Sequence, residues 1–229
     1  MDFSRRSNQG ESMDDPALDE SDYRRCLADL ARVNRVTLTH VATIDWLARK
    51  TRALPRAECV SVLDIGCGQG DLLRGIAAWA RRQGRSFSLT GLDLNPRSAA
   101  TARALSGDED ITYLTGDVFA FRPDAKPDFI VSSQFTHHLA DAQIVQLLGW
   151  LQEHARLGWH IADLHRHWFA YYGYPLLARL LGWHPIVRAD GQISIARGFS
   201  RREWEALLAR AGLHARIKWH PLFRYSVST

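Results

Sequence analysis

The sequence has few cysteines and few lysines, and each shortage excludes a class of protein. Its three cysteines, Cys26, Cys59 and Cys67, are odd in number and form no C-x-x-C pair. We therefore expect neither a disulfide framework nor a zinc knuckle. Only three of the 29 basic residues are lysines, and the arginines are spread along the chain without a run of five basic residues. This distribution argues against a dedicated nucleic-acid surface.

Long apolar runs are also missing. The nearest candidate, residues 168–183, is interrupted by Pro175 and Arg179 and falls short of the roughly 18 apolar residues of a membrane span. Residues 1–16 are polar and lack the apolar core of a signal peptide. We therefore expect a cytoplasmic protein without stable membrane insertion.

What is present suits an ordinary globular protein. The chain has 229 residues, 46% of them hydrophobic and 24% charged, and a net charge of +4. This size fits one α/β domain with a small cap. Residues 1–18 are polar and predict a disordered tail. Residues 19–54 predict an N-terminal helical cap, with one helix beginning near Asp22 and a second at 39–52. Residues 55–229 form the main domain.

Strand and helix patterns alternate through the main domain. Apolar strands are expected at 59–65, 87–92, 111–114, 128–133 and 159–164, with helices between them. This alternation predicts a parallel sheet with right-handed crossovers. Residues 165–198 are aromatic and partly helical, with a turn expected at Asp190-Gly191. A helix capped by Ser200 and Glu203 follows. Two strand-like runs, 215–220 and 222–227, predict a terminal antiparallel hairpin.

The first strand runs into a glycine-rich turn that contains Gly66, Gly68 and Gly70. In a dinucleotide-binding turn the third glycine would stand where this chain has Asp71, and a carboxylate there repels a pyrophosphate. Asp64, just before the turn, suits a ligand that carries positive charge. The turn therefore favours a zwitterionic, sulfonium-bearing ligand over a dinucleotide.

These residues resemble the class I S-adenosylmethionine-dependent methyltransferases. Residues 62–70 are similar to the first motif of that family, Asp93 stands where an acid holds the ribose hydroxyls, and Asp117-Val118 stand where an acid and its neighbour meet the adenine. The resemblance implies a Rossmann-like fold with a seven-stranded, mostly parallel sheet and helical lids, and S-adenosylmethionine as cofactor, leaving S-adenosylhomocysteine as product. It implies these cofactor-binding residues: Asp64, Gly66, Cys67, Gly68, Gly70, Asp93, Leu94, Asp117, Val118 and Ser133.

Catalytic candidates follow the fourth and fifth strands, where ligands of such sheets bind. They are His137, His138, Asp163 and His165. We favour His165 as the general base because it lies two residues beyond its strand, where an acceptor would enter. Asp163 is expected to orient an imidazole. No third ligand accompanies Asp163 and His165, so no metal is expected.

The methyl acceptor is predicted largely by exclusion. Residues 132–135 read Ser-Ser-Gln-Phe and lack the segment by which nucleic-acid amino-methylating enzymes resemble one another. The aromatic insertion at 165–198 is expected to roof an apolar pocket, whose predicted residues are Gln134, His167, Tyr171 and Tyr172. The resemblance extends to bacterial methyltransferases that tailor phenolic or polyketide-like metabolites. We expect O-methylation of a phenolic or enolic hydroxyl on a small molecule; C-methylation, RNA or DNA methylation and a non-methylating homologue remain alternatives, and a homodimer is possible.

Overall fold

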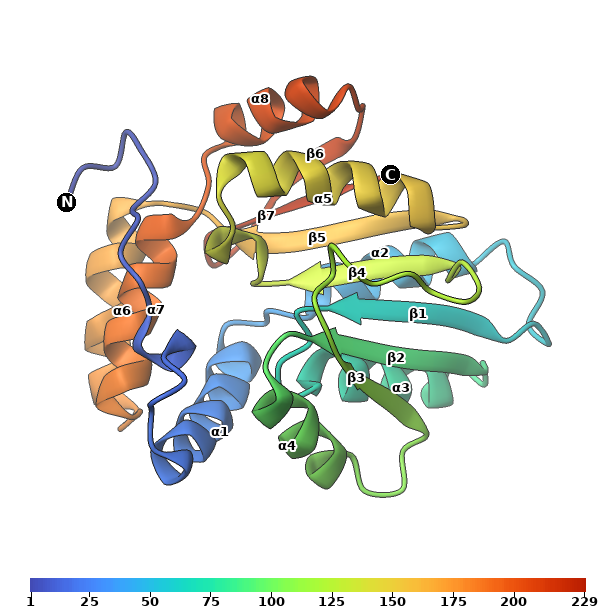
Figure 1. The fold of residues 1–229 in the computed structure, drawn as a ribbon, viewed down its shortest axis with the longest axis horizontal. Coiled ribbons are helices and arrows are strands. Elements are labelled where there is room, and N and C mark those ends of the chain that lie inside the picture. The colour runs from blue at the N-terminus through green and yellow to red at the C-terminus, as the bar shows by residue number, and fades with distance from the viewer.

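The computed structural model describes all 229 residues and is built around a seven-stranded sheet (Figure 1). The strand order is β3-β2-β1-β4-β5-β7-β6. Strands β1 to β5 are parallel, β7 is antiparallel to both of its neighbours, and the terminal hairpin is therefore confirmed. The strands are β1 (Val60–Ile65), β2 (Phe87–Asp93), β3 (Ile111–Thr115), β4 (Phe129–Ser133), β5 (Gly158–Leu164), β6 (Arg216–His220) and β7 (Arg224–Ser228).

Helices cover both faces of the sheet and enclose two apolar cores. On one face lie α2 (Val41–Thr51), α3 (Asp71–Arg82) and α4 (Pro96–Ser106), and on the other α5 (Asp141–His154) and α8 (Arg201–Ala211). Helix α2 was expected in the cap but belongs to the first face. Its Trp46 is 4% exposed and packs edge-on against Phe129 with 5.3 Å between ring centroids.

The predicted capping box at the start of α8 is confirmed, and α4 is also capped by a side chain. The side chain of Asn95 accepts a hydrogen bond from the backbone N–H of Arg97 at the start of α4. Ser200 and Glu203 form a capping box at the start of α8, and Gly212 ends that helix in the left-handed conformation. These signals are local, so the sequence alone is enough to place them.

Three helices lie beyond the carboxyl ends of the strands: α1 (Glu20–Val36), α6 (Trp168–Leu180) and α7 (Pro185–Arg197) (Figure 1). They share a small core that includes Val33, Ala178 and Val187. We call these three helices the lid. None of the helices of the protein is long and apolar enough to span a membrane.

One expectation for this region is wrong. Asp190-Gly191 does not make a turn but lies inside α7, where Gly191 leaves room for Tyr174; a Cβ at that position would lie 2.3 Å from the tyrosine ring. The chain turns earlier, at Gly182, which has a φ of 66°.

Residues 1–18, expected to be a disordered tail, instead pack along the lid, and the single-turn helix η1 (Ser12–Asp14) lies within them (Figure 1). The backbone N–H of Ser7 donates to the carbonyl of Ala196 at 3.0 Å. The carboxylate of Asp190 accepts the backbone N–H groups of Ser12 and Met13, each at 2.9 Å. Hydrogen bonds to distant residues help to hold this segment in place, and composition does not show such partners.

Candidate active site

The glycine turn after β1 is crowded at its first and last glycines and has free space at the middle one. Gly66, Gly68 and Gly70 all have positive φ, at 67°, 52° and 74°. A Cβ at Gly66 would lie 2.6 Å from the ring of Phe135, and one at Gly70 would lie 2.2 Å from the hydroxyl of Tyr113. Nothing lies within 4 Å of the position that a Cβ would take at Gly68. The turn therefore requires glycine for its backbone and presents free space at its middle residue.

Two buried polar atoms beside this turn have no partner. They are Oδ1 of Asp64, at the end of β1, and Oγ of Ser133, at the end of β4. The strand order reverses between β1 and β4, which is where ligands of open α/β sheets bind. Burial raises the pKa of Asp64 well above its usual value, and the charges of Asp71 and Asp93 add to that effect. The unpartnered atoms and the concentration of carboxylates fit a ligand that brings hydrogen-bond donors and positive charge.

Asp93, at the end of β2, is also placed for a ligand. Its carboxylate accepts the backbone N–H of Gly68 at 2.8 Å and that of Asn95 at 2.9 Å. Burial raises its pKa, although these two hydrogen bonds oppose the shift. The next residue, Leu94, is 72% exposed, which leaves an apolar side chain available beside the acid.

Of the remaining predicted cofactor residues, one is exposed and two are buried. Asp117 is exposed after β3 and accepts the backbone N–H of Phe119 at 2.9 Å. Val118 is buried in the core, and so is Cys67, whose thiol pKa is raised by burial. The structure thus brings the predicted residues to the carboxyl ends of β1 to β4.

Asp71 ties the glycine turn to the lid. Its Oδ2 accepts the side-chain amide of Asn34 at 2.8 Å and lies 2.9 Å from Nε2 of His40. Burial alone would raise the pKa of Asp71, but His40 and Asn34 more than offset this and hold it below its usual value. Asn34 also accepts the side-chain amide of Gln134 at 2.8 Å, which joins α1 to the end of β4.

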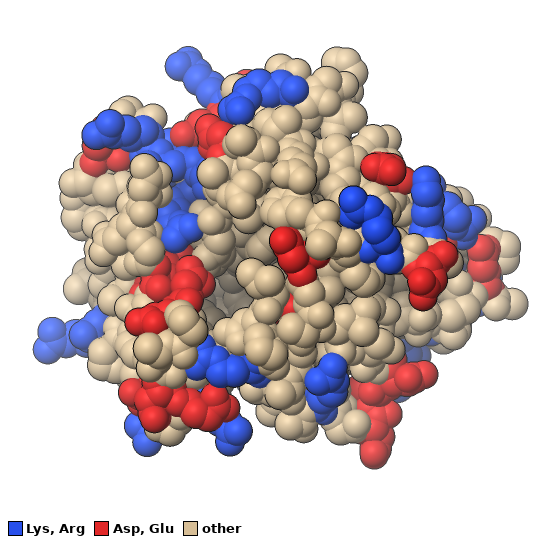
Figure 2. Space-filling view, viewed as in Figure 1, with Lys and Arg blue, Asp and Glu red and all other residues tan.

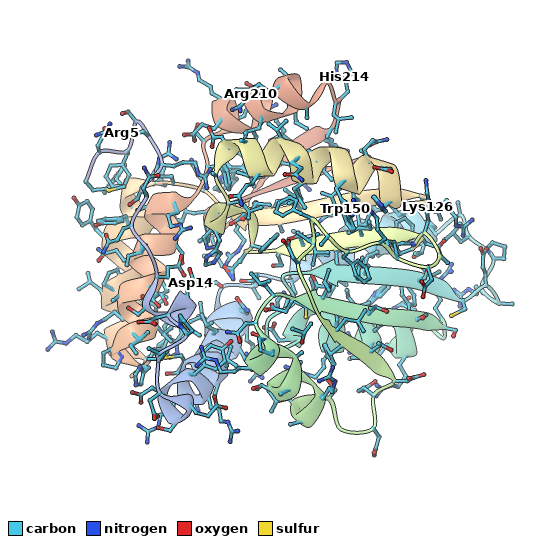
Figure 3. All side chains as sticks on the ribbon, in the orientation of Figure 1. Arg5, Asp14, Lys126, Trp150, Arg210 and His214 are labelled. Atoms are coloured by element: carbon cyan, nitrogen blue, oxygen red, sulfur yellow. The ribbon has the colours of Figure 1, made fainter.

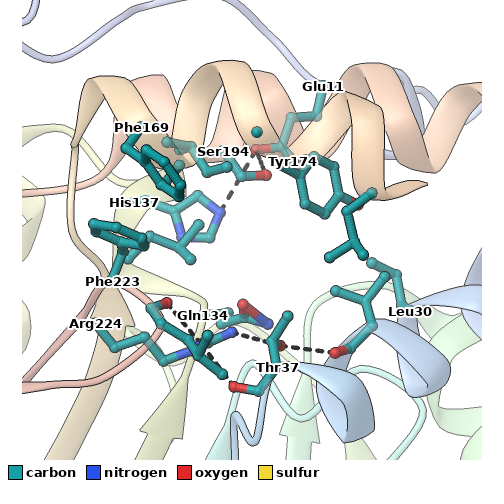
Figure 4. Close-up of a pocket in the computed structure, with 18 of the residues that line it drawn as sticks. Glu11, Leu30, Thr37, Gln134, His137, Phe169, Tyr174, Ser194, Phe223 and Arg224 are labelled. Atoms are coloured by element: carbon teal, nitrogen blue, oxygen red, sulfur yellow. Dashed lines mark hydrogen bonds and ion pairs between the residues drawn. The ribbon is translucent and has the colours of Figure 1, made fainter. Parts of the chain in front are cut away.

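A cavity of about 440 Å³ lies between the lid and the carboxyl ends of β4 and β5 (Figure 4). The face of the molecule shown in Figure 2 is hollowed in this region, and acidic side chains border the hollow on the lid side. Gln134, His137 and His138 line the cavity, as do the aromatic rings of Phe169 and Tyr174. Its other lining residues are Glu11, Leu30, Val33, Thr37, Leu164, Ala170, Gly173, Leu177, Gly191, Ser194, Ile195, Leu222, Phe223 and Arg224.

His137 is the most strongly held polar side chain of the cavity. It belongs to the short helix η2 (Thr136–His138) after β4, and its Nδ1 lies 2.7 Å from Oδ1 of Asp163 on β5. The backbone N–H of His137 donates to the same carboxylate at 3.0 Å, and the hydroxyl of Thr136 also donates to it. Burial would lower the pKa of His137, but Asp163 and Glu11 outweigh it and raise that pKa to about 9.

Other predicted site residues lie outside the cavity. Burial and two neighbouring basic side chains lower the pKa of His165 to about 4, and its Nδ1 accepts the indole N–H of Trp219 at 3.2 Å. His167 caps α6 and stacks on Phe223 with 4.8 Å between ring centroids. Tyr171 and Tyr172 both face the ring of Phe3, with centroids 5.5 and 6.3 Å away. The geometry therefore favours His137 over His165 as the imidazole that meets an acceptor.

Sequence reasoning missed two charged residues of the cavity. Glu11 lies in the segment expected to be disordered, and its Oε1 lies 3.5 Å from Nε2 of His137. Arg224 is 4% exposed and donates to the carbonyl and hydroxyl of Thr37 at 3.0 and 2.8 Å. Burial lowers the pKa of Arg224 to about 10. A lone arginine at the start of a strand carries no signal of this role, because its partners lie almost the whole chain away.

Comparisons with known proteins agree with this site. Residues 62–158 match a family described as "Methyltransferase domain". The fold is similar to that of the plantazolicin methyltransferase BpumL bound to a desmethylPZN analogue and S-adenosylhomocysteine (SAH), with a TM-score of 0.67, 16% identity and coverage of 91% of this chain and 90% of that one.

Two further solved structures are similar. Magnesium protoporphyrin IX methyltransferase (ChlM) from Synechocystis PCC 6803 with bound SAH has a TM-score of 0.57 and 15% identity, covering 94% of this chain and 90% of that one. LepI in complex with S-adenosylmethionine (SAM) has a TM-score of 0.59 and 18% identity, covering 80% of this chain and 46% of that one.

The fold is thus that of the class I methyltransferases. The family match covers residues 62–158, which include the glycine turn, Asp64, Asp93 and Ser133.

Proposed function

We propose that the protein O-methylates a phenolic or enolic hydroxyl on a small apolar or aromatic molecule of bacterial secondary metabolism. The observation that carries this proposal is the cavity of about 440 Å³. Its volume is in the range of small-molecule sites, and its lining is largely apolar with a few convergent polar groups. The polar groups lie at the ends of β4 and β5, on the side of the sheet that holds the donor.

The donor would be held by the glycine turn, Asp64, Asp93 and Ser133, whose open or unpartnered atoms fit it. When bound, SAM supplies a methyl group that is already activated by the sulfonium. The protein therefore has to align the acceptor and exclude water. The lid encloses the cavity, and the apolar rings of Phe169 and Phe223 can lie against an aromatic acceptor. His137, oriented by Asp163, is available to hydrogen-bond the acceptor's hydroxyl.

The test uses pairs of acceptors that differ only at the hydroxyl. We expect SAH to form with phenols and enolised diketones, and not with the corresponding methyl ethers. Mass spectrometry and NMR of the product then locate the new methyl group. Methyl on carbon would replace this proposal by C-methylation, and turnover of an oligonucleotide in place of every small molecule would overturn it.

The pair formed by His137 and Asp163 has its own test. Replacing Asp163 by Asn removes the charge that orients His137, and we expect turnover to fall by about 10–100-fold, the loss expected for one hydrogen bond to a charged group. The matched control is His214→Asn, because His214 is exposed and lies far from the cavity, near the end of α8 (Figure 3). Equal activity of the Asp163→Asn variant and the wild type would remove His137 and Asp163 from the mechanism.

A further inference from the structure

Glu11, His137 and His138 converge at the lid side of the acceptor cavity, and all three line it. One potential ligand atom from each lies within 4.8 Å of the other two. Nε2 of His137 is 3.5 Å from Oε1 of Glu11, and Nε2 of His138 is 3.9 Å from Oε2 of Glu11. Ligand atoms around a tetrahedral zinc ion stand about 3.4 Å apart, as bond lengths near 2.0–2.1 Å require. Each imidazole is therefore near ligand spacing from one oxygen of Glu11.

Each of these three side chains also has a hydrogen-bond partner that orients it. Nδ1 of His137 lies 2.7 Å from Oδ1 of Asp163, and Nδ1 of His138 lies 3.1 Å from Oδ2 of Asp14, labelled in Figure 3. The hydroxyl of Ser194 donates to Oε1 of Glu11 at 2.8 Å. Metal-binding imidazoles usually give their other ring N–H to a carboxylate, and metal-binding carboxylates are themselves hydrogen-bonded. Both imidazoles thus have one nitrogen fixed by a carboxylate and the other directed at Glu11.

We propose that Glu11, His137 and His138 bind one divalent transition-metal ion, with zinc the best match, at the wall of the acceptor cavity. Two imidazole nitrogens and one carboxylate oxygen suit zinc or a similar ion, whereas magnesium prefers oxygen ligands alone. Three protein ligands leave a coordination position open, as in catalytic zinc sites. Zinc would displace the proton from Nε2 of His137. The ion, in place of a direct hydrogen bond from that imidazole, would then polarise an acceptor oxygen bound there; this use rests on the proposed function, but the binding of the metal does not.

This site differs from the expectation of no metal, which considered only Asp163 and His165. The structure places Asp163 behind His137, where it orients the imidazole, and directs His165 toward Trp219. The carboxylate that completes the set belongs to the N-terminal segment. Glu11 and His137 are 126 residues apart in sequence, so no spacing motif indicates the site.

The experiment measures metal binding directly, on chelator-treated protein that carries no histidine tag. Zinc is added in competition with a chromophoric chelator, and cobalt is followed by its visible absorption. We expect one equivalent of zinc, and a cobalt spectrum of low coordination number. Glu11→Gln and His138→Gln should each weaken zinc binding at least tenfold, whereas His214→Gln, on the exposed far side, should leave it unchanged. Magnesium in excess should not displace the zinc.

Each variant is first shown to be folded by the increase in unfolding temperature that SAH causes, because the donor site does not include these residues. Absence of stoichiometric zinc binding, or equal affinity in the wild type and in the Glu11→Gln and His138→Gln variants, would overturn the metal site. Methyl transfer by a zinc-free protein that fails to bind zinc would leave the proposed function intact. Zinc binding without methylation of any hydroxyl acceptor would support the metal site and count against the proposed function.

Discussion

At the scale of single residues, Asp64 opposes the stability of the free protein. Its side chain is 2% exposed, and Oδ1 has no hydrogen-bond partner. Because burial raises its folded-state pKa above the unfolded value, Asp64 destabilises the fold increasingly as the pH rises above about 4. We expect Asp64→Asn to raise the thermal unfolding midpoint of the free protein at pH 7. The same variant should bind SAM about 10–100-fold more weakly, the loss expected for one hydrogen bond to a charged group.

Calorimetry of unfolding and titration calorimetry with SAM measure these two effects. The stability difference between Asp64→Asn and the wild type should shrink toward zero at low pH, where the wild-type carboxyl is protonated in both states. Ser132→Ala, on the neighbouring strand β4, is the control, because the hydroxyl of Ser132 already has a partner in the carbonyl of Ile65. A variant at Asp64 that binds SAM as tightly as the wild type would contradict the role assigned to this carboxylate.

Residue identity alone could not rank the candidate histidines. His137, His138 and His165 all follow strand ends, and a sequence pattern cannot distinguish them further. What separates them is the partner across the sheet: Asp163 for His137, and Trp219 for His165. Those partners depend on strand register and on the short helix η2, neither of which the sequence specifies to one residue.

At the scale of elements, three loops around the cavity carry backbone strain. The non-glycine residues with positive φ are Leu38, Gln134, Leu222 and Phe223. Three of them line the cavity, and Leu38 follows Thr37, which also lines it. Each costs about 1–2 kcal/mol in the left-handed region, which only surrounding contacts can offset. Strain of this kind collects at functional sites, and its position here agrees with an acceptor cavity.

The packing of α6 on α7 gives an element-scale prediction. A methyl group at Gly191 would lie 2.3 Å from the ring of Tyr174, whose hydroxyl donates to the carbonyl of Val187 at 3.0 Å. We expect Gly191→Ala to separate the two helices and to cost about 1–3 kcal/mol, as overpacking usually does. The KM for the acceptor should rise, while the dissociation constant for SAM stays the same because neither Gly191 nor Tyr174 is among the predicted donor-binding residues.

Gly149→Ala is the matched control. Gly149 is an exposed glycine within α5, and nothing lies within 4 Å of the position of its Cβ. Alanine there should be neutral or stabilising by up to about 1 kcal/mol. Denaturant unfolding measures the stability of both variants, and steady-state kinetics measures their activity. If Gly191→Ala is as stable and as active as Gly149→Ala, the close packing of α6 on α7 does not shape the cavity.

Elements with local signals were predictable, and those defined by packing were not. The strands, the glycine turn and the caps of α4 and α8 follow from periodicity and capping residues within a few positions. The lid helices depend on contacts between distant segments. In Asp190-Gly191, usual turn chemistry is overridden because Asp190 binds the N-terminal segment and Gly191 accommodates Tyr174.

At the scale of the whole molecule, the N-terminal segment joins the lid to the domain beneath it (Figure 1). The guanidinium of Arg6 donates to the carbonyls of His137 and Leu139, each at 3.0 Å, and pairs with Asp141 at 2.9 Å. Its Nε donates to the carbonyl of Arg197 at the end of α7, at 2.9 Å. One side chain thus connects α7, η2 and the start of α5. Together with Glu11, which lines the cavity, it makes residues 1–18 part of the domain rather than a tail outside it.

Removing this segment should therefore weaken methylation of the proposed acceptor without weakening the binding of SAH. A chain that begins at Met13 lacks both Arg6 and Glu11, and we expect its methylation of the acceptor to fall at least tenfold. Its affinity for SAH should stay within about twofold of the full chain, because the glycine turn, Asp64 and Asp93 remain. Arg6→Gln, which keeps the segment but loses its charge, should give an intermediate loss, since hydrogen bonds to charged groups contribute about 1.5–3 kcal/mol. Equal methylation rates for the shortened and the full chain would show that the cavity closes without these residues. A parallel loss of SAH binding would show instead that the segment supports the whole fold, and calorimetric titration with SAH distinguishes the two outcomes.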